Sequence, residues 1–356
     1  MTRFGIEEEF VLLDRASLAA VPLGVAASDA MRAMDRPGAV STEFLTCQVE
    51  HATSPTDSLA GARAELVGFR DPLSRFAAEH GAIAAGTGTP FGTGESATVS
   101  PSARYARIAE WLGDITGGHQ VNGLHVHAEV LDEEERIRAL NRLRPWLPVL
   151  LAVSGNAPFW HTRDTGYHSW RSVLLRRLPT MGCPPAFADA THYREVADRL
   201  IRLQAAPDVA SLSWSARVSD RFPTVEVRVC DAQLTPDDTL FVTALIRALV
   251  VSAPDGPDLG TDAIDAALWM AARDGLDAML IDPLTGEATP GAEVRRALMD
   301  TVTGALQDAG DLAFVDGHLQ RVLADGTGSQ RQLRAYATGG VEGLQALFTA
   351  DEVIPL

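Results

Sequence analysis

Three glutamates stand side by side near the start of the chain, in the run Arg3-Phe-Gly-Ile-Glu-Glu-Glu-Phe-Val-Leu-Leu13. Apolar residues flank the triplet, which indicates a partly buried β-strand. Alternate side chains of a strand point to opposite faces, so we expect Glu7 and Glu9 on one face and Glu8 on the other. Two carboxylates on a half-buried surface repel each other unless a positive group lies between them. Their hard oxygen ligands favour magnesium or manganese.

Two other strand-like segments repeat this two-residue spacing, with His125 and His127 in one and Glu226 and Arg228 in the other. If the strands share a sheet, their polar residues form one floor of carboxylates, imidazoles and a guanidinium group. A solvent-exposed face could show the same alternation, and for any single pair both interpretations stay open. Three such pairs together favour a functional site.

Glu43 and Glu50 are less regular, because a separation of seven residues sends two side chains of a regular strand to opposite faces. Either a β-bulge intervenes, or Glu43 lies in a turn before the strand that holds Glu50. Taken alone, Glu43 is expected to be a surface residue.

The spacing His125-Val-His127 also occurs at zinc sites, so a metal-dependent hydrolase with Glu7 as its base is an alternative hypothesis. The glycine-rich loop 86–94 could cradle a phosphate or form an ordinary turn, and it matches neither standard phosphate-binding motif. Arg171 and Arg217 lie near aromatic residues in loop-like segments. Their guanidinium groups could bind phosphate or carboxylate, or form surface salt bridges.

The elements that must position these residues follow from periodicity and capping signals. Strands are expected at 4–13, around 46–52, and at 81–86, 124–130 and 224–229. Helices are expected from about Thr56 to Glu79, with Pro72 kinking or dividing the helix, from Asp132 toward Val153, at about 237–252, and through most of the last hundred residues. Residues 156–190 are expected to form a long loop region. Strands recur without regular βαβ alternation, so we predict one α+β domain over residues 1–356, with helices on one side of an antiparallel or mixed sheet.

The bulk composition narrows the class of protein. The chain has 356 residues, of which 46% are hydrophobic and 22% charged, and its formal net charge is −17. Such a charge disfavours nucleic acid and acidic membranes as partners. Three cysteines without C-x-x-C spacing are typical of a reducing compartment. The first expected strand starts too early for a signal peptide, and the apolar stretch 240–253 is too short to span a bilayer, so we expect a cytoplasmic protein.

The order of these motifs resembles the type-2 glutamate–cysteine ligase family, and most of all its bacterial carboxylate–amine ligase branch. The segments that carry the resemblance are Gly5-Ile-Glu-Glu-Glu-Phe10, Glu43, Glu50-His-Ala-Thr53, Gly123-Leu-His-Val-His127 and Thr224-Val-Glu-Val-Arg-Val-Cys-Asp231. The chain departs from the family pattern at Gly88, which precedes Thr89-Pro90-Phe91 where the family usually has a histidine after the threonine.

This resemblance implies a glutamine-synthetase-like catalytic fold, in which the inner face of a curved, mainly antiparallel sheet holds metal ions, ATP and an amino acid. The implied metal ligands are Glu7, Glu9, Glu43, Glu50, His125 and Glu226. The implied catalytic residues are Arg228, Arg171 and Arg217, and the implied ATP contacts are Arg228, Arg217 and His127.

The implied reaction is an ATP- and Mg²⁺-dependent ligation of a carboxylate to an amine through an acyl phosphate, with Mn²⁺ as an alternative metal. Glutamate or a related acid would be activated, cysteine would be the reference amine, and the family suggests a homodimer. A catalytically silent nucleotide-binding homologue is the remaining alternative, besides the hydrolase.

Overall fold

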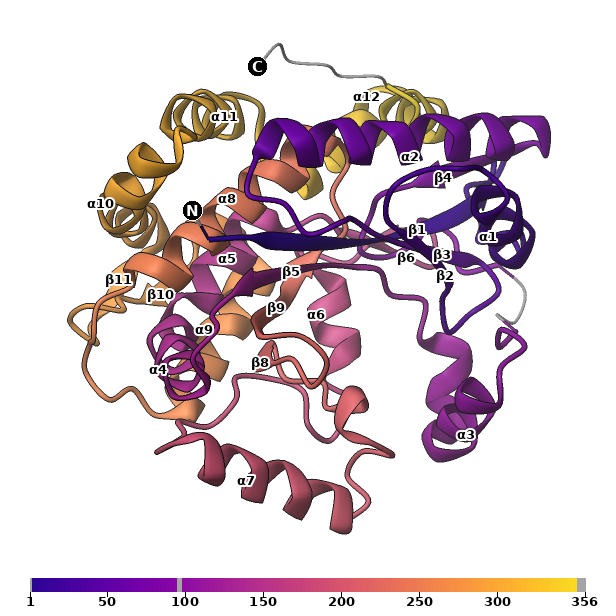
Figure 1. Cartoon of the computed structure of the whole chain (residues 1–356). Coiled ribbons are helices and arrows are strands. Elements are labelled where there is room, and N and C mark those ends of the chain that lie inside the picture. Colours follow the sequence, from indigo (N-terminus) through magenta and orange to yellow (C-terminus); the bar gives the residue numbers. More distant parts are fainter. Residues whose placement is uncertain (1, 95–97, 351–356) are drawn as a thin grey trace.

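A seven-stranded antiparallel sheet forms the centre of the computed structural model, which describes residues 2–94 and 98–350 (Figure 1). The strand order is β2-β3-β1-β5-β9-β8, and β4 also pairs with β1. The strands are β1 (Phe4–Asp14), β2 (Ala39–Thr42), β3 (Gln48–Ala52), β4 (Ala82–Ala85), β5 (Gly123–Glu129), β8 (Ala216–Val218) and β9 (Thr224–Asp231). Two small hairpins lie outside this sheet, β6 (Phe159–Trp160) with β7 (Arg163–Asp164) and β10 (Met279–Ile281) with β11 (Ala288–Pro290).

The helices lie mostly on one face of the sheet, although the one at 103–112 borders the opposite face. They are α1 (Gly24–Arg32), α2 (Leu59–Glu79), α3 (Ala103–Leu112), α4 (Glu133–Leu143), α5 (Leu147–Ser154), α6 (Trp170–Leu175), α7 (Ala190–Arg202), α8 (Pro236–Ser252), α9 (Thr261–Asp274), α10 (Gly291–Ala309), α11 (Leu312–Asp325) and α12 (Gly328–Phe348). The α+β prediction is therefore confirmed. Among the described residues, no helix is both long and apolar enough to cross a membrane.

The strand pattern decides which side chains enter the core. Phe4 and Ile6 of β1, Leu124 and Val126 of β5, and Val227 of β9 are buried in the largest apolar cluster, together with residues of α4, α5 and α8. The residues that come directly before and after these apolar residues in each strand must then point to the other face of the sheet. One face is thus covered by helices, and the opposite face is free to carry polar groups.

Several element boundaries differ from expectation. Helix α2 begins after Ser58, whose hydroxyl accepts the N–H of Gly61, rather than at Thr56. It continues through Pro72 as one element, so the predicted division is wrong. The expected helix after Asp132 is split into α4 and α5 by a short 3-10 turn at 144–146. The expected loop at 156–190 contains α6 and the β6–β7 hairpin. The predicted capping box at Thr235 is confirmed.

A buried ionic cluster ties α8 to the two C-terminal helices. One carboxylate oxygen of Asp238 lies 3.1 Å from Nε2 of His318 and pairs with Arg321, and the other accepts a 3.1 Å hydrogen bond from Arg331. Burial alone would raise the pKa of Asp238, but the His318 hydrogen bond and the charges of Arg321 and Arg331 outweigh it and hold the pKa below its ordinary value.

The Asp238 cluster predicts acid-sensitive stability. Because the folded-state pKa is depressed, the stabilisation is present above the unfolded-state pKa of about 4 and is lost as pH falls below it. Asp238→Asn removes the buried carboxylate that pairs with Arg321, so we expect a loss of about 3–5 kcal/mol in unfolding free energy. Urea unfolding of the parent and the variant at pH 7 and below pH 3 measures both effects. A variant as stable as the parent at pH 7 would contradict the structural role of this pair.

Candidate active site

The polar face of the sheet forms the floor of a cavity of about 480 Å³, and it brings together all ten residues predicted as site residues. Its floor and walls include Glu7, Glu9, Glu43, Glu50, His125, His127, Arg171, Arg217, Glu226 and Arg228. The predicted polar floor therefore exists.

Strand register explains the convergence. Across the sheet, Glu50 lies opposite Glu9, His125 opposite Glu7, and Glu226 opposite His127. A bulge shifts the register between β5 and β9 near Leu124 and Val126. Side chains directly opposite each other on antiparallel strands have Cβ atoms about 5 Å apart. Four strands therefore present neighbouring acidic and imidazole groups on one face.

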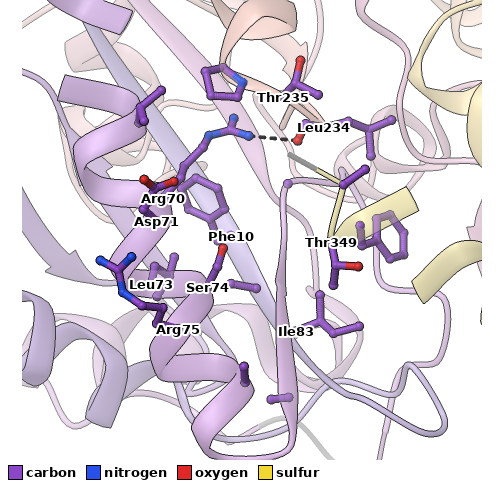
Figure 2. A pocket seen from close by; sticks show the side chains of 18 of the residues that line it. Phe10, Arg70, Asp71, Leu73, Ser74, Arg75, Ile83, Leu234, Thr235 and Thr349 are labelled. Carbon is purple, nitrogen blue, oxygen red and sulfur yellow. Dashed lines mark hydrogen bonds between the residues drawn. The ribbon is translucent and has the colours of Figure 1, made fainter. Parts of the chain in front are cut away.

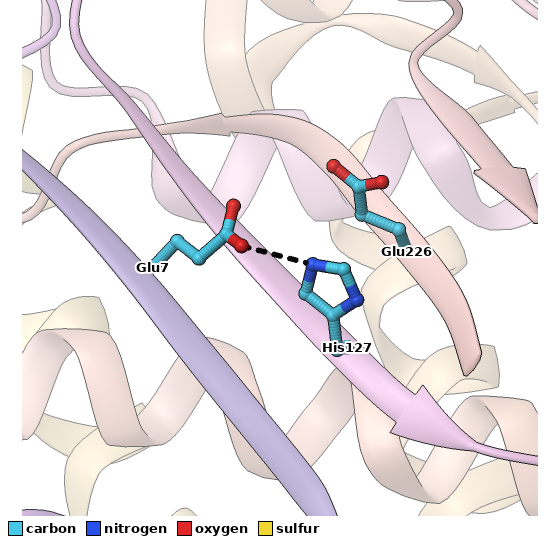
Figure 3. Close-up of side chains that lie close together, drawn as sticks. All are labelled: Glu7, His127 and Glu226. Carbon is cyan, nitrogen blue, oxygen red and sulfur yellow. Dashed lines mark ion pairs between the residues drawn. The ribbon is translucent and has the colours of Figure 1, made fainter. Parts of the chain in front are cut away.

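Three of these groups could hold one metal ion. Ligand atoms of Glu7, His127 and Glu226 all lie within 4.8 Å of one another (Figure 3). Nδ1 of His127 lies 2.8 Å from the hydroxyl of Thr224, and Nε2 lies 3.3 Å from a carboxylate oxygen of Glu7. A hydrogen bond at one ring nitrogen that leaves the other facing carboxylates is the usual arrangement of a metal-binding histidine. This grouping places His127, expected as an ATP contact, beside the expected metal ligands.

His125 bridges to the second acidic group of β1. Its Nδ1 lies 3.2 Å from a carboxylate oxygen of Glu7, and its Nε2 lies 3.8 Å from Glu9. Burial, followed by the charge of Arg228, lowers the pKa of His125 to about 4. For Glu7, burial opposes ionisation, but hydrogen bonds and charge from His125 and His127 hold the pKa well below its ordinary value. Glu7 is therefore ionised and the imidazole of His125 is neutral at pH 7.

The remaining carboxyl groups crowd one another. Burial, followed by the charge of Glu43, raises the pKa of Glu9 to about 8, although Glu9 also accepts a 2.6 Å hydrogen bond from the N–H of Gly123. Burial and the charges of Glu43, Glu7 and Glu9 raise the pKa of Glu50 well above its ordinary value. Such repulsion is what a bound divalent cation would relieve, so this donor set fits a hard metal ion.

Glu43 is not a surface residue, contrary to its interpretation in isolation. It follows the last residue of β2, and residues 44–47 then turn the chain into β3, where Ser41 of β2 lies opposite Glu50. Of the two alternatives, a β-bulge or a turn before the strand that holds Glu50, the turn is therefore confirmed. Glu43 is half-buried and lines the cavity, and burial raises the pKa of its carboxyl group.

Two of the three expected arginines, Arg171 and Arg217, donate hydrogen bonds to main-chain carbonyl groups. Arg171 is buried and donates to the carbonyls of Val229 and Cys230, so it is not a surface salt bridge. Arg217 donates to Glu226 at 2.7 Å and to the carbonyl of Ala210 at 2.7 Å. Arg228 pairs with Glu226 on the cavity side.

Residues outside the predicted set of site residues also line the cavity. Arg104 and Tyr105 come from α3, and Phe222 comes from the turn between β8 and β9. Phe222 is 56% exposed, and its ring lies 6.1 Å from that of His127. In the sequence, the available signal was an aromatic residue in the turn-like segment Ser219-Asp-Arg-Phe-Pro223, just before the predicted strand at 224. Glycine-rich loop 86–94 does not line this cavity, so its phosphate-cradle reading is not supported.

A second cavity of about 540 Å³ lies on the opposite face, between α2, β4 and the end of α12 (Figure 2). Arg70 crosses it, donating at 2.9 Å to the carbonyl of Leu234 and pairing with Glu8. Phe10 lies under the Arg70 guanidinium group, 5.1 Å from its ring centroid. Glu8, the middle residue of the acidic triplet, thus faces the helices as predicted and has a structural partner.

Comparison with known proteins decides the family. The model of glutamate–cysteine ligase family 2 matches residues 3–350. The chain belongs to this family. A relative from Saccharopolyspora erythraea, provisionally named glutamate–cysteine ligase 2-2, is 40% identical over 97% of this chain and 91% of its own length. A relative of the same provisional name from Frankia alni is 37% identical over 94% of this chain and 93% of its own length.

Solved structures share the fold. A bifunctional glutathione synthetase from Pasteurella multocida has a TM-score of 0.72 at 16% identity over 97% of this chain, which spans about half (51%) of that chain. Glutamate–cysteine ligase from Francisella tularensis in complex with AMP has a TM-score of 0.70 at 15% identity, over 98% of this chain and 89% of its own. The predicted glutamine-synthetase-like fold is confirmed, and family membership identifies the protein as a ligase.

Proposed function

We propose that this protein is an ATP- and Mg²⁺-dependent carboxylate–amine ligase that forms an amide through an acyl phosphate, with glutamate or a related amino acid as the activated acid. Glutamate–cysteine ligation would then be a secondary activity. The observation that carries the proposal is the meeting of five glutamates, two histidines and Arg228 on one cavity floor, in a chain of a ligase family.

The chemistry explains why such a floor is useful. A carboxylate is unreactive toward amines because its leaving group is poor, and transfer of the ATP γ-phosphoryl group replaces it with phosphate. The obstacle is charge, since a carboxylate must approach a polyanionic triphosphate. Divalent ions, when bound, neutralise and align the phosphate oxygens. Glu7, His127 and Glu226 would hold one ion, while Glu9, Glu43, Glu50 and His125 offer ligands for a further one.

The three arginines of the site have different proposed roles. Arg228 would stabilise the charge of the transferred phosphoryl group, because its guanidinium lies on the cavity side of Glu226. Arg171 would hold the end of β9 through its carbonyl contacts, and Arg217 would fix the orientation of Glu226. We therefore assign positioning roles to Arg171 and Arg217, rather than the direct phosphate contacts that the family resemblance implied.

Phe222 supports one orientation of the nucleotide. Its exposed ring stands over the Glu226 end of the floor, where we place the adenine ring. Base–aromatic stacking is worth about 1–3 kcal/mol, so Phe222→Ala should weaken AMP-PNP binding by about 10-fold, and Phe222→Tyr should not. Calorimetric titration with Mg²⁺–AMP-PNP measures this effect. Equal affinity of the parent and Phe222→Ala for AMP-PNP would show that the adenine ring does not lie at this end of the floor.

The whole chain is proposed as one catalytic domain that acts as a homodimer. A single apolar cluster joins residues from Phe4 of β1 to Val322 of α11, which favours one folding unit. Light scattering should then give twice the 38.0 kDa mass of the chain. A mass of one chain at micromolar concentration would refute the dimer.

An ADP-release assay tests the proposed reaction. The full chain is incubated with ATP, Mg²⁺ and pairs of amino acids and amines, and we expect ADP and an amide only when both substrates are present. Turnover of amide substrates without ATP would favour the hydrolase that uses His125 and His127 around zinc. Nucleotide binding with no ADP from any pair would favour a silent homologue.

A further inference from the structure

The cavity has an acidic floor but an apolar wall at its Glu9 and Glu43 end. The wall consists of Phe44, Ile108, Trp111, Leu175, Leu178 and Met181. We call these six side chains the apolar recess. They come from the turn after β2, from α3, and from α6 with the loop that follows it. Leu178 packs against the clusters of both sides, so the two walls meet there.

The recess adjoins the acidic floor. Phe44 follows Glu43 in the chain, and its ring lies 5.8 Å from that of Tyr105 in an edge-on arrangement. The Tyr105 hydroxyl donates to the carbonyl of Thr42 at 2.9 Å, which fixes α3 against the end of β2. The opposite end of the floor carries His127, Glu226 and Phe222, where the nucleotide is placed. The Glu43 end, at β2 and β3, is thus the end of the floor away from the proposed site of the base.

The recess side chains are not fully packed. Ile108, Trp111, Leu178 and Met181 are only half-buried, although all four are large and apolar. Covering such surface contributes about 25 cal/mol per Å². A ligand with an apolar body would gain this free energy, whereas a small polar substrate would leave the wall exposed to water.

The basic side chains beside the recess are poorly suited to bind a carboxylate group of the amine substrate. Among the described residues beside it, Arg104 already pairs with Asp208 at 3.5 Å and donates to Ser211 at 3.2 Å. His119 lies edge-on to Phe44 and has no hydrogen-bond partner for its buried Nδ1. Burial, followed by the charge of Arg177, lowers its pKa to about 4, so it carries no charge at neutral pH.

We propose that the amine substrate is a primary amine with an apolar body, aromatic or branched aliphatic, and without a carboxylate of its own. Its amino group lies at the Glu43 end of the floor, and its body fills the apolar recess. This inference rests on the proposed ligase function. In the reaction, the ammonium loses one proton to solvent and the amine nitrogen forms a C–N bond with the acyl phosphate. The C–O bond to phosphate breaks, inorganic phosphate leaves with the electron pair, and the amide nitrogen releases a second proton.

The test compares two ends of the cavity with 2-phenylethylamine as the probe. Met181→Gln keeps the side-chain length and makes the recess polar, so the KM for 2-phenylethylamine and its calorimetric Kd should both rise at least 10-fold, while the KM for ATP is unchanged. Phe222→Ala is the matched control and should raise the KM for ATP alone. Ile108→Asn repeats the test on α3, and circular dichroism verifies that each variant is folded.

The outcomes separate this inference from the proposed function. ADP release with cysteine or ammonia, but with no apolar amine, would overturn the inference and leave the ligase intact. Met181→Gln raising the KM for ATP instead would place the adenine ring in the recess and also overturn it. Absence of ADP with every pair would refute the proposed function itself, whatever the calorimetry gives.

Discussion

Glu226→Gln should reduce Mg²⁺-dependent ADP formation by more than about 100-fold, because even the outer partners of metal ligands typically contribute about 10–100-fold. Glu226 combines two roles. Its carboxylate completes the cluster with Glu7 and His127, and it receives the charge of Arg217 and Arg228. Burial would raise its pKa, but these two arginines outweigh it and keep the pKa low, so the carboxylate is ionised at pH 7.

The same substitution should also destabilise the protein. Two arginines that point at one buried carboxylate lose their counter-charge, which typically costs about 3 kcal/mol or more. Urea unfolding and a coupled ADP assay on the same preparation measure both effects. Glu135→Gln is the matched control, because Glu135 forms only surface pairs with Arg138 and Arg142 on α4, and such pairs are worth less than about 1 kcal/mol. Turnover of Glu226→Gln within threefold of the parent would contradict the metal assignment.

Glu9→Gln should abolish activity to a similar extent but affect stability in the opposite direction. Glu9 lies among other carboxyl groups, and burial followed by the charge of Glu43 raises its pKa where no cation is bound. A glutamine keeps the acceptor for the N–H of Gly123 and removes the repulsion, so the melting temperature without metal should be equal or higher. The divalent cation, however, loses one ligand.

Thermal unfolding with and without Mg²⁺ distinguishes the two glutamates. We expect Mg²⁺ with AMP-PNP to raise the melting temperature of the parent by clearly more than that of Glu9→Gln, which keeps only the ion site of Glu7, His127 and Glu226. A variant that keeps the full metal-dependent shift would show that Glu9 is not a ligand. A variant that unfolds earlier than the parent without metal would show that the carboxyl group is needed for folding rather than for cation binding.

Much of the site could be predicted because strand geometry is simple. The two-residue spacing of Glu7 with Glu9 and of His125 with His127 fixes which side chains share a face, and buried apolar neighbours fix which face is which. Glu226 and Arg228 follow the same rule on β9. Periodicity also placed Glu8 among the helices, where Arg70 receives it.

The features that the sequence did not predict depend on tertiary contacts between distant segments. Glu43 reaches the floor only because a turn returns the chain to β3, and its seven-residue separation from Glu50 cannot reveal that turn. Arg171 was read as a phosphate contact or a surface pair, because its carbonyl partners on β9 are about 58 residues away in sequence. The apolar recess joins α3 to the loop after α6, and no local pattern marks residues from two distant helices as one wall. Pro72 was tolerated within α2, where tertiary packing overrides a local helix-breaking preference.

The most direct test of the central claim is a crystal structure of the full chain with Mn²⁺ and AMP-PNP, read by the anomalous signal of manganese. The account predicts manganese peaks at about 2.0–2.3 Å from carboxylate oxygens of Glu7, Glu9 and Glu226, with the triphosphate bound to the same ions. Manganese peaks that lie elsewhere, with these three side chains free of metal beside a bound nucleotide, would contradict it.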